Sequence, residues 1–153
     1  MMNVNQILIE TAETLRSFEW MEGIPVIVEE KADPDTQTET EIAQQSLCVV
    51  VGEGGFEPTV QAPDPNSPNS VIGQVSIVVS VFEKPVINRA DEDATTIKAL
   101  SREIGKALAW CKARDMAAPL FLRRITPISL FRVEGDQDAI ITRDVEFSTT
   151  AEL

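Results

Sequence analysis

The feature that most constrains the fold is a segment in which apolar and polar residues alternate. Every second residue from Val75 to Val81 is apolar, and most of the residues between them are polar. This pattern is typical of a strand with one face on a core. The preceding segment "APDPNSPNS" (62–70) holds three prolines and indicates a polar loop. Before that loop, "SLCVVVGEGG" (46–55) is apolar on both faces, as a central strand would be. The sequence therefore predicts two core strands that flank a long loop.

Apolar residues spaced three and four positions apart predict two helices. The first covers residues 4–18 and has Asn3 or Asn5 available as its cap. The second covers residues 97–111, and the acidic residues 91–93 are expected to cap it. Both helices would bury one apolar stripe and leave the other side polar.

The remaining segments complete an α+β layout. The expected order is helix, three strands, helix, two strands, which predicts a mainly antiparallel sheet of about five strands with two helices packed on one face. One domain is expected over residues 1–153, because 153 residues with 43% hydrophobic content can bury a core. The last two strands are expected to form a hairpin around the turn 134–138. Strands are expected at 23–30, 46–55, 75–81, 123–133 and 139–149, and long loops at 31–45 and 53–70.

Location and redox state are also constrained by the sequence. No apolar stretch approaches the roughly 20 residues of a membrane span, and the N-terminus does not resemble a signal peptide, so a soluble protein without a membrane partner is expected. Cys48 and Cys111 lie at apolar positions, which favours two buried thiols in a reducing compartment and leaves one disulfide as the alternative.

The charge is both large and uneven. A net charge of −12 argues against nucleic acid as a direct ligand, because binding to the phosphate backbone needs clustered Lys and Arg. Residues 1–83 hold 14 acidic and 2 basic residues, whereas residues 84–153 hold 11 of each. The commoner interpretation is a solvated acidic face. The other is a subunit with two complementary sides that packs head to tail against copies of itself.

Patterns that carry catalysis are missing from the sequence. It has no histidine and no CxxC pair, which removes the commonest general base and the usual zinc and redox motifs. "GEGG" (52–55) is unlike a phosphate loop, because Glu53 and Glu57 would repel the anion, and a flexible hairpin exit is expected instead. The acidic run 91–93 is interpreted as a helix cap in preference to a Mg²⁺ site. No enzyme, cofactor or metal is predicted, and binding to protein is expected.

Three aromatic residues lie near the ends of the expected helices. Phe18, Trp20 and Trp110 could in principle stack on a ligand. Their positions favour packing in the core or at an interface.

One segment resembles a known family. In "GQVSIVVSVFEKPVINRADEDATTIKALSREIGKAL" (73–108), an alternating strand is followed by Glu-x-Pro-x-x-Asn-Arg and a Thr-rich approach to an amphipathic helix. The segment resembles tail terminator or tail completion proteins of the lambda type, which phage and prophage tail-assembly clusters encode. The likeness is concentrated at Glu83, Pro85, Asn88 and Arg89. From the residues alone, these four form a strand-to-helix turn in which Pro85 ends the ladder and Asn88 bonds to local backbone.

The resemblance implies a role in virion assembly. A tail terminator forms a ring, usually hexameric, that caps the tail tube, stops its polymerisation and joins it to the head connector. The implied partners are copies of the chain itself, the tail tube and the head–tail connector. The implied location is the virion tail, and the host cytoplasm during assembly.

In such a ring, acidic surface of one subunit is expected to meet basic residues of the next. The loop 53–70 would reach a neighbour or the tube, although a tolerated excursion without function is the alternative. The expected interface residues are Lys98, Arg102, Lys106, Lys112, Arg123, Arg124, Phe56 and Glu57.

Two other functional classes stay open. An acidic inhibitor or immunity-type protein could occupy the basic site of a nucleic-acid-handling partner, which the net charge would suit. An enzyme built from carboxylates and lysines is the third class, but no pair of residues at a meaningful spacing supports it.

Overall fold

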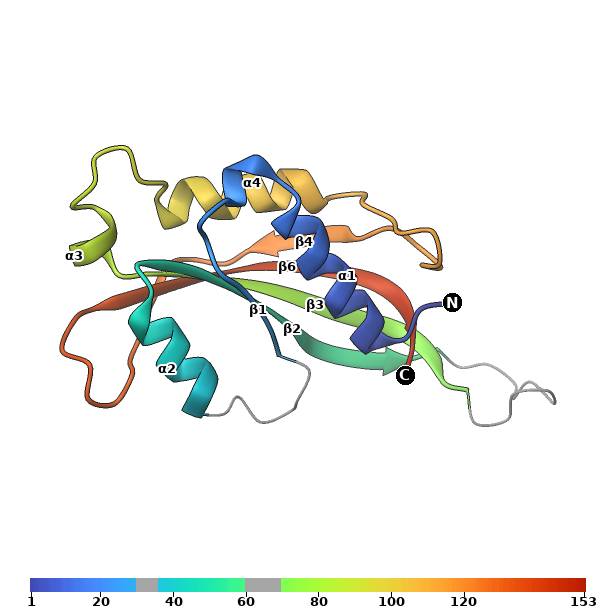
Figure 1. Cartoon of the computed structure of the whole chain (residues 1–153). Coiled ribbons are helices and arrows are strands. Elements are labelled where there is room, and N and C mark those ends of the chain that lie inside the picture. Colours follow the sequence, from blue (N-terminus) through green and yellow to red (C-terminus); the bar gives the residue numbers. More distant parts are fainter. Residues whose placement is uncertain (30–35, 60–69) are drawn as a thin grey trace.

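The computed structural model describes residues 1–29, 36–59 and 70–153 (Figure 1). Their helices are α1 (Val4–Arg16), α2 (Thr36–Gln44), α3 (Pro85–Asn88) and α4 (Ile97–Leu108), with a 3-10 turn at Glu19–Met21. Their strands are β1 (Val26–Glu29), β2 (Leu47–Pro58), β3 (Ile72–Glu83), β4 (Phe121–Ile125), β5 (Ser129–Phe131) and β6 (Ile140–Glu152).

The strands form one sheet in the order β1-β2-β3-β6-β4, and β5 pairs with the other end of β6. β1 runs parallel to β2, and the other pairs are antiparallel. The predicted α+β layout with a mainly antiparallel sheet is confirmed. Residues 123–133 were expected to form one strand, but they form β4 and β5. Pro127 lies between them, has no N–H to donate and interrupts the ladder.

The longest strand pairing at the centre of the sheet is that of β3 with β6. Its register runs over twelve residue pairs, from Ile72 opposite Glu152 to Glu83 opposite Ile141. The alternation that predicted β3 is confirmed, because Val75, Ile77, Val79 and Val81 are fully buried. The predicted hairpin partner of residues 123–133 is confirmed as β6.

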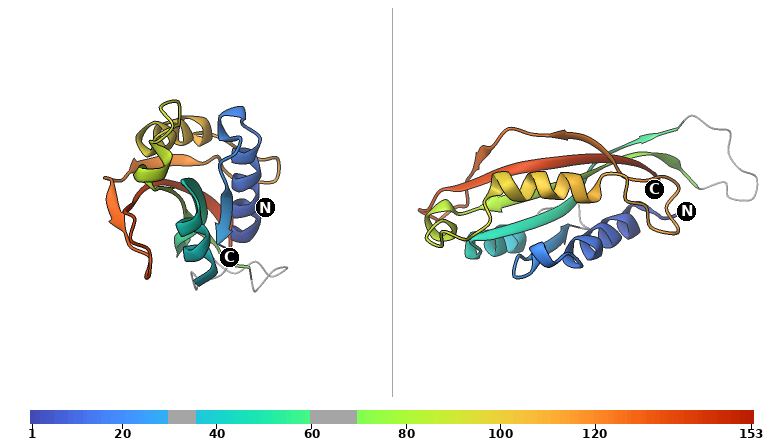
Figure 2. Two further views of the ribbon diagram at one scale, coloured as in Figure 1. Left: turned by 60° about the vertical axis from the view of Figure 1, so that its left-hand side comes forward. Right: turned by 90° about the horizontal axis from the view of Figure 1, so that it is seen from above.

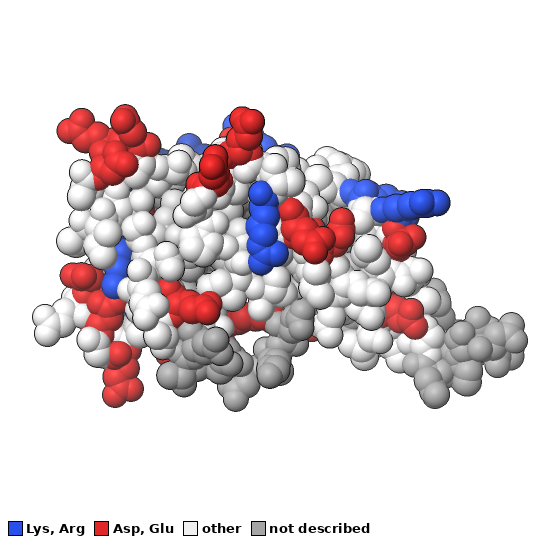
Figure 3. Space-filling model, in the orientation of Figure 1, with Lys and Arg blue, Asp and Glu red and all other residues white. Residues whose placement is uncertain are grey.

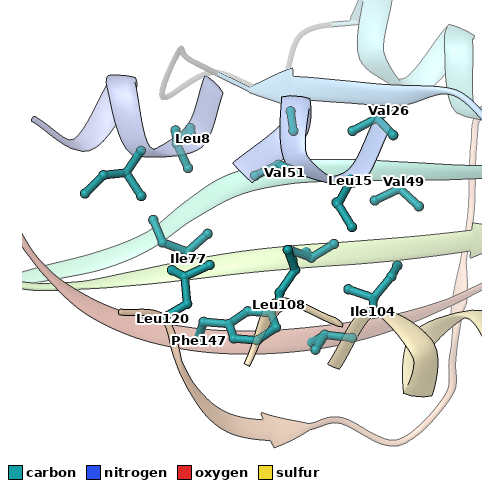
Figure 4. Packing of buried hydrophobic residues seen from close by; sticks show 14 of the residues in the cluster. Leu8, Leu15, Val26, Val49, Val51, Ile77, Ile104, Leu108, Leu120 and Phe147 are labelled. Atoms are coloured by element: carbon teal, nitrogen blue, oxygen red, sulfur yellow. The ribbon is translucent and has the colours of Figure 1, made fainter. Parts of the chain in front are cut away.

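Helices α1 and α4 cover one face of the sheet, here called the first face (Figures 1 and 2). Asn3 caps α1: its side chain accepts from the Gln6 backbone N–H, and the Gln6 side chain accepts from the Asn3 N–H. Thr96 caps α4, so the expected capping by residues 91–93 is wrong. The acidic run lies one turn too early and remains exposed. Figure 4 shows how the two helices meet the strands: Leu8, Leu15, Ile104 and Leu108 pack over Val49, Val51, Ile77 and Phe147.

Helix α2 lies on the opposite face, here called the second face. Residues 31–45 were expected to be loop; residues 36–44 are helical, and residues 30–35 lie outside the described part. Short helices draw most of their stability from packing, and α2 buries Ile42 where the sequence shows no sustained period. The resulting second cluster contains Ile42, Cys48, Val50, Phe82 and Ile140, with Ile27, Phe131 and Val133 packed against it.

A buried lysine ties the elements of this second cluster together. The Lys84 ammonium lies 2.6 Å from the Asp136 carboxylate and donates a hydrogen bond to the carbonyl of Ala43. These contacts connect the end of β3 to α2 and to the loop between β5 and β6. Because Lys84 is buried, both partners are needed to offset the lost hydration of its charge.

The glycines at 52–55 lie inside a strand. They were expected to form a flexible hairpin exit at the start of a loop, but β2 continues to Pro58, with a register shift between Glu53 and Gly55. A Cβ on Gly54 would lie 2.7 Å from Val78 Cγ2, so the strand pairing itself requires this glycine. The rest of the expected loop, residues 60–69, lies outside the described residues.

Candidate functional site

The basic residues predicted for an interface do not form one patch. Lys98, Arg102 and Lys106 are exposed along α4, and Lys112 follows that helix. Arg123 and Arg124 are exposed on β4, where Arg124 pairs with Glu146 at 3.2 Å. The eight predicted residues therefore divide between the outer side of α4 and the β4 edge of the sheet, apart from Phe56 and Glu57 at the far end of β2.

The structure does bring three of the predicted residues together. Phe56, Glu57 and Arg123 line a surface groove of about 700 Å³ that spans β2, β3, β6 and β4, beyond the part of the second face that α2 covers. The Phe56 side chain itself packs against the first-face cluster. The Arg123 Nε donates a hydrogen bond of 2.6 Å to Ser148 Oγ, which holds the guanidinium along the groove. The remaining lining combines small and polar residues with two apolar ones and consists of Gly54, Gly55, Gln74, Val75, Ser76, Phe121 and Ser148.

The strands of the acidic first half of the chain (residues 1–83) and those of the second half (84–153) occupy different lateral halves of the sheet. The strand order places β1, β2 and β3 on one side and β6 and β4 on the other. Figure 3 shows one face of this arrangement, with acidic side chains over α2 and a compact acidic group over the turn between α3 and α4. Basic side chains on this face gather mainly over the loop that follows α4.

Glu83, in the segment that carries the family resemblance, is a buried carboxylate. It is fully buried at the end of β3 and accepts a hydrogen bond of 2.5 Å from Asn88 Nδ2 and one of 3.0 Å from Arg89 Nη2. Asn88 Nδ2 also donates to the Thr95 carbonyl at 2.8 Å. The interpretation as a strand-to-helix turn is confirmed, because Pro85 begins α3 directly after β3 and Asn88 bonds to local backbone. A buried carboxylate needs such partners, so the network fixes α3 against the sheet.

The fixed turn presents an apolar and acidic surface. Val86 and Ile87 on α3 are 69% and 50% exposed, and Asp91, Glu92 and Asp93 follow them on the surface. We call these five residues the α3 knob. Its carboxylates were expected to cap a helix, so this surface was not predicted; the pair Val86–Ile87 beside three acids was the available signal.

The other end of α4 carries an exposed tryptophan. Trp110 is 72% exposed, and its φ of 67° is the only positive φ of a non-glycine residue among the described residues. Its backbone N–H donates a hydrogen bond to the Leu120 carbonyl at 2.8 Å. Its indole ring packs edge to face against Phe121, with ring centroids 5.1 Å apart. Phe18 and Trp20 differ from it, because they stack on each other at 5.0 Å and pack against the core.

The two thiols and the carboxylates of the described residues do not gather into one cluster. Burial, reinforced by the nearby Glu41 charge, raises the pKa of the Cys48 thiol to about 12, so this thiol stays protonated at neutral pH. Cys111 is half-buried in the loop after α4, so the prediction of two buried thiols holds only for Cys48, and both cysteines are free. Within residues 1–29, 36–59 and 70–153, no three His, Cys, Asp or Glu side chains gather as metal ligands. No helix in that part of the chain is long and apolar enough to cross a membrane.

Comparison with known proteins gives a structural likeness only. No family model matches the sequence, and no curated protein matches it. The fold is similar to that of a chain in the structure titled "Virion of native gene transfer agent (GTA) particle", with a TM-score of 0.50 and 15% sequence identity. The likeness covers 94% of this chain and 92% of the other. At this identity the comparison establishes a common fold.

Proposed function

We propose that this chain is a structural protein of a phage or phage-like particle and that it acts as a tail terminator. The observation that carries the proposal is the likeness in fold, over 94% of this chain, to a chain of a gene transfer agent virion. Because the likeness also covers nearly all of the other chain, it concerns whole subunits and not one shared motif.

The resemblance of residues 73–108 to tail terminator and completion proteins supports the finer assignment. Of its four most similar residues, Glu83, Asn88 and Arg89 form the network around the buried Glu83 carboxylate, and Pro85 begins α3. A sequence pattern in which three side chains form one connected network is more informative than scattered likenesses, since Glu83 takes its partners from Asn88 and Arg89.

The proposed mechanism is steric and associative. Copies of the chain, six in the working hypothesis, close into a ring on the last layer of the tail tube, which stops polymerisation and offers a surface to the head–tail connector. The exposed cations of α4 and β4 are candidate contacts between subunits, and the groove lined by Phe56, Glu57 and Arg123 is a candidate contact with the tube. The protein would assemble in the host cytoplasm and remain in the virion tail.

The proposal is tested by assembly on tubes. Purified chain is mixed with polymerised tail-tube protein at low salt and the tube ends are imaged by negative stain, with light scattering of the free chain across a concentration series alongside. Closed rings at tube ends and shorter tubes are expected. A chain that stays at 16.8 kDa at every concentration and leaves tube length unchanged would refute the terminator role. If that monomer instead bound a nuclease in a salt-sensitive manner, the acidic inhibitor would become the better hypothesis.

A further inference from the structure

The two ends of α4 form complementary surfaces. The α3 knob precedes the helix and combines exposed Val86 and Ile87 with three carboxylates. After the helix, Trp110 lies beside Phe121, with Lys112 and Arg114 exposed in the same loop. We call these four residues the Trp110 patch. The views in Figures 1 and 2 agree that the turn before α4 and the loop after it lie at opposite ends of the molecule.

We propose that the α3 knob of one copy binds the Trp110 patch of the next copy. The inference deepens the proposed function and rests on it, because it names the contact that would build the ring. Two different surfaces at opposite ends give a head-to-tail contact, which repeats from copy to copy and closes when the rotation between copies allows it. The occupant of each surface is therefore another copy of this chain.

Charge supports this pairing. Asp91, Glu92 and Asp93 are all exposed, and the nearby Arg89 already pairs with Glu83. The loop at the other end exposes Lys112 and Arg114 against the single acid Asp115. Opposite charges that meet across an interface favour this register and oppose knob-to-knob or patch-to-patch contacts.

The backbone at Trp110 supports a binding role for this residue. A left-handed conformation after a helix end is usually supplied by glycine, because a side chain is strained there. The chain instead holds a large aromatic residue in this conformation and leaves 72% of it exposed. The subunit does not bury the Trp110 side chain, so packing within the fold does not explain why this strained conformation is kept. Tryptophan and arginine are the residues most often found at energetic centres of interfaces, and the patch contains both.

The knob is rigid enough to bind without large ordering costs. The Glu83 carboxylate accepts from both Asn88 and Arg89, and Asn88 also bonds to the Thr95 carbonyl, which closes the turn on both sides. A surface held in its bound shape loses less conformational entropy on association. The Trp110 indole of one copy would pack against the exposed Val86 and Ile87 side chains of the next copy.

Charge reversal at each end tests the contact. The variants are D91K/D93K at the knob, K112E/R114E at the patch and the combination of all four, each measured by sedimentation velocity across protein concentration, alone and on tail tubes. Each double reversal is expected to raise the concentration needed for assembly by about 30-fold or more, because like charges then face each other. The fourfold variant, whose charges are again complementary, is expected to assemble within about 3-fold of the original chain.

A substitution of the indole separates binding from folding. Trp110→Gly removes the side chain and suits the positive φ, so its melting temperature is expected to be equal or higher while assembly weakens by about 30-fold. Leu130→Ala, at another side chain that is 63% exposed, is the matched control and is expected to leave assembly unchanged.

Each outcome decides for or against the contact. Weakened double variants with a restored fourfold variant support it. The contact is refuted if both double variants form rings as readily as the original chain. It is also refuted if the original chain never self-associates, even on tubes. The two proposals fail separately: rings on tubes that ignore the reversals leave the terminator role standing, whereas reversal-sensitive rings that do not bind tubes leave only the contact standing.

Discussion

The two faces of the sheet are covered to very different extents. On the first face, α1 and α4 together cover the strands, and most side chains that β3 directs towards them are completely buried. On the second face, α2 and the loop after β5 cover only one end, around Ile42 and Phe82. The other half of that face is small, polar and hollowed into the groove beside Arg123. Among the described residues, the first face is therefore covered along its length, whereas half of the second face has no helix over it.

The open half is adapted to water by its side-chain pairs. Gln74 bonds to Thr150 across β3 and β6 at 3.1 Å, and Ser80 bonds to Asp144 at 2.7 Å. These polar pairs replace the apolar packing found on the first face. A sheet surface with polar side chains does not bind apolar surfaces nonspecifically. A partner would therefore have to match its hydrogen-bonding groups.

The largest difference between the faces is expected from aromatic truncation. Phe147→Ala removes a fully buried ring of the first face and is expected to lower the free energy of unfolding by about 4 kcal/mol. Phe131→Ala removes a half-buried ring at the margin of the second cluster and is expected to cost about 1 to 2 kcal/mol. Urea titrations measure both; equal costs would contradict the asymmetry between the faces.

The next effect concerns a glycine at the open end of the sheet. A Cβ on Gly73 would lie 2.2 Å from the Glu57 carbonyl oxygen, which belongs to the neighbouring strand. Gly73→Ala is therefore expected to cost about 3 kcal/mol, because β2 has to shift. Gly55→Ala is the control: nothing lies within 4 Å of its Cβ position, and it is expected to change stability by less than about 0.5 kcal/mol. Thermal unfolding of the two variants would show whether the open end is tightly paired despite its exposure.

The covered end of the second face depends on one charged pair. The hydrogen bond from Lys84 lowers the pKa of the Asp136 carboxyl below its ordinary value of 3.8. The stabilisation is therefore complete above the ordinary value and is lost as the pH falls through the lowered one. Asp136→Asn is expected to melt earlier than the original chain at pH 7, and the difference should shrink below about pH 4. A difference independent of pH would assign the effect to packing and not to charge.

The smallest expected effect lies in the groove itself. Ser76 is exposed on the open half, so Ser76→Thr is expected to change the free energy of unfolding by less than about 0.5 kcal/mol. Chemical denaturation gives this value, and binding to tail tubes gives a second one. A variant that folds normally but binds tubes less well would place the groove at the tube contact.

The parts of the fold that the sequence predicts are those with a sustained period. Strand β3 and helices α1 and α4 each repeat an apolar spacing over many residues, because each buries one whole side against a large core. Helix α2 shows no such repeat; among its described side chains, Ile42 is the one buried in the second cluster. The glycines at 52–55 resemble a turn in the sequence, but they pair with β3, where Val78 leaves no room for a side chain at Gly54.

The candidate surfaces are harder to predict, because they depend on what lies beside a residue and not on its spacing. Lys98 and Arg123 were recognisable as exposed cations, but their separation on α4 and β4 depends on the order of the strands. The acids at 91–93 were interpreted as a cap because they precede a helix. Thr96 caps α4 instead, and the acids remain exposed on the surface. Trp110 is exposed and has a positive φ, and neither property follows from the spacing of apolar residues in the sequence.

The position of β6 has a consequence for how the chain is made. It comes last of the six strands in the sequence, yet it pairs with β3, β4 and β5. During synthesis the sheet therefore stays divided, with α4 unable to close over β6, until residues 140–152 have left the ribosome. Such distant pairings form slowly, and the unpaired edge of β3 would be exposed to other chains in the meantime. Self-assembly would then have to wait until β6 has emerged and paired with these strands, so the synthesis of β6 sets the earliest time at which assembly can begin.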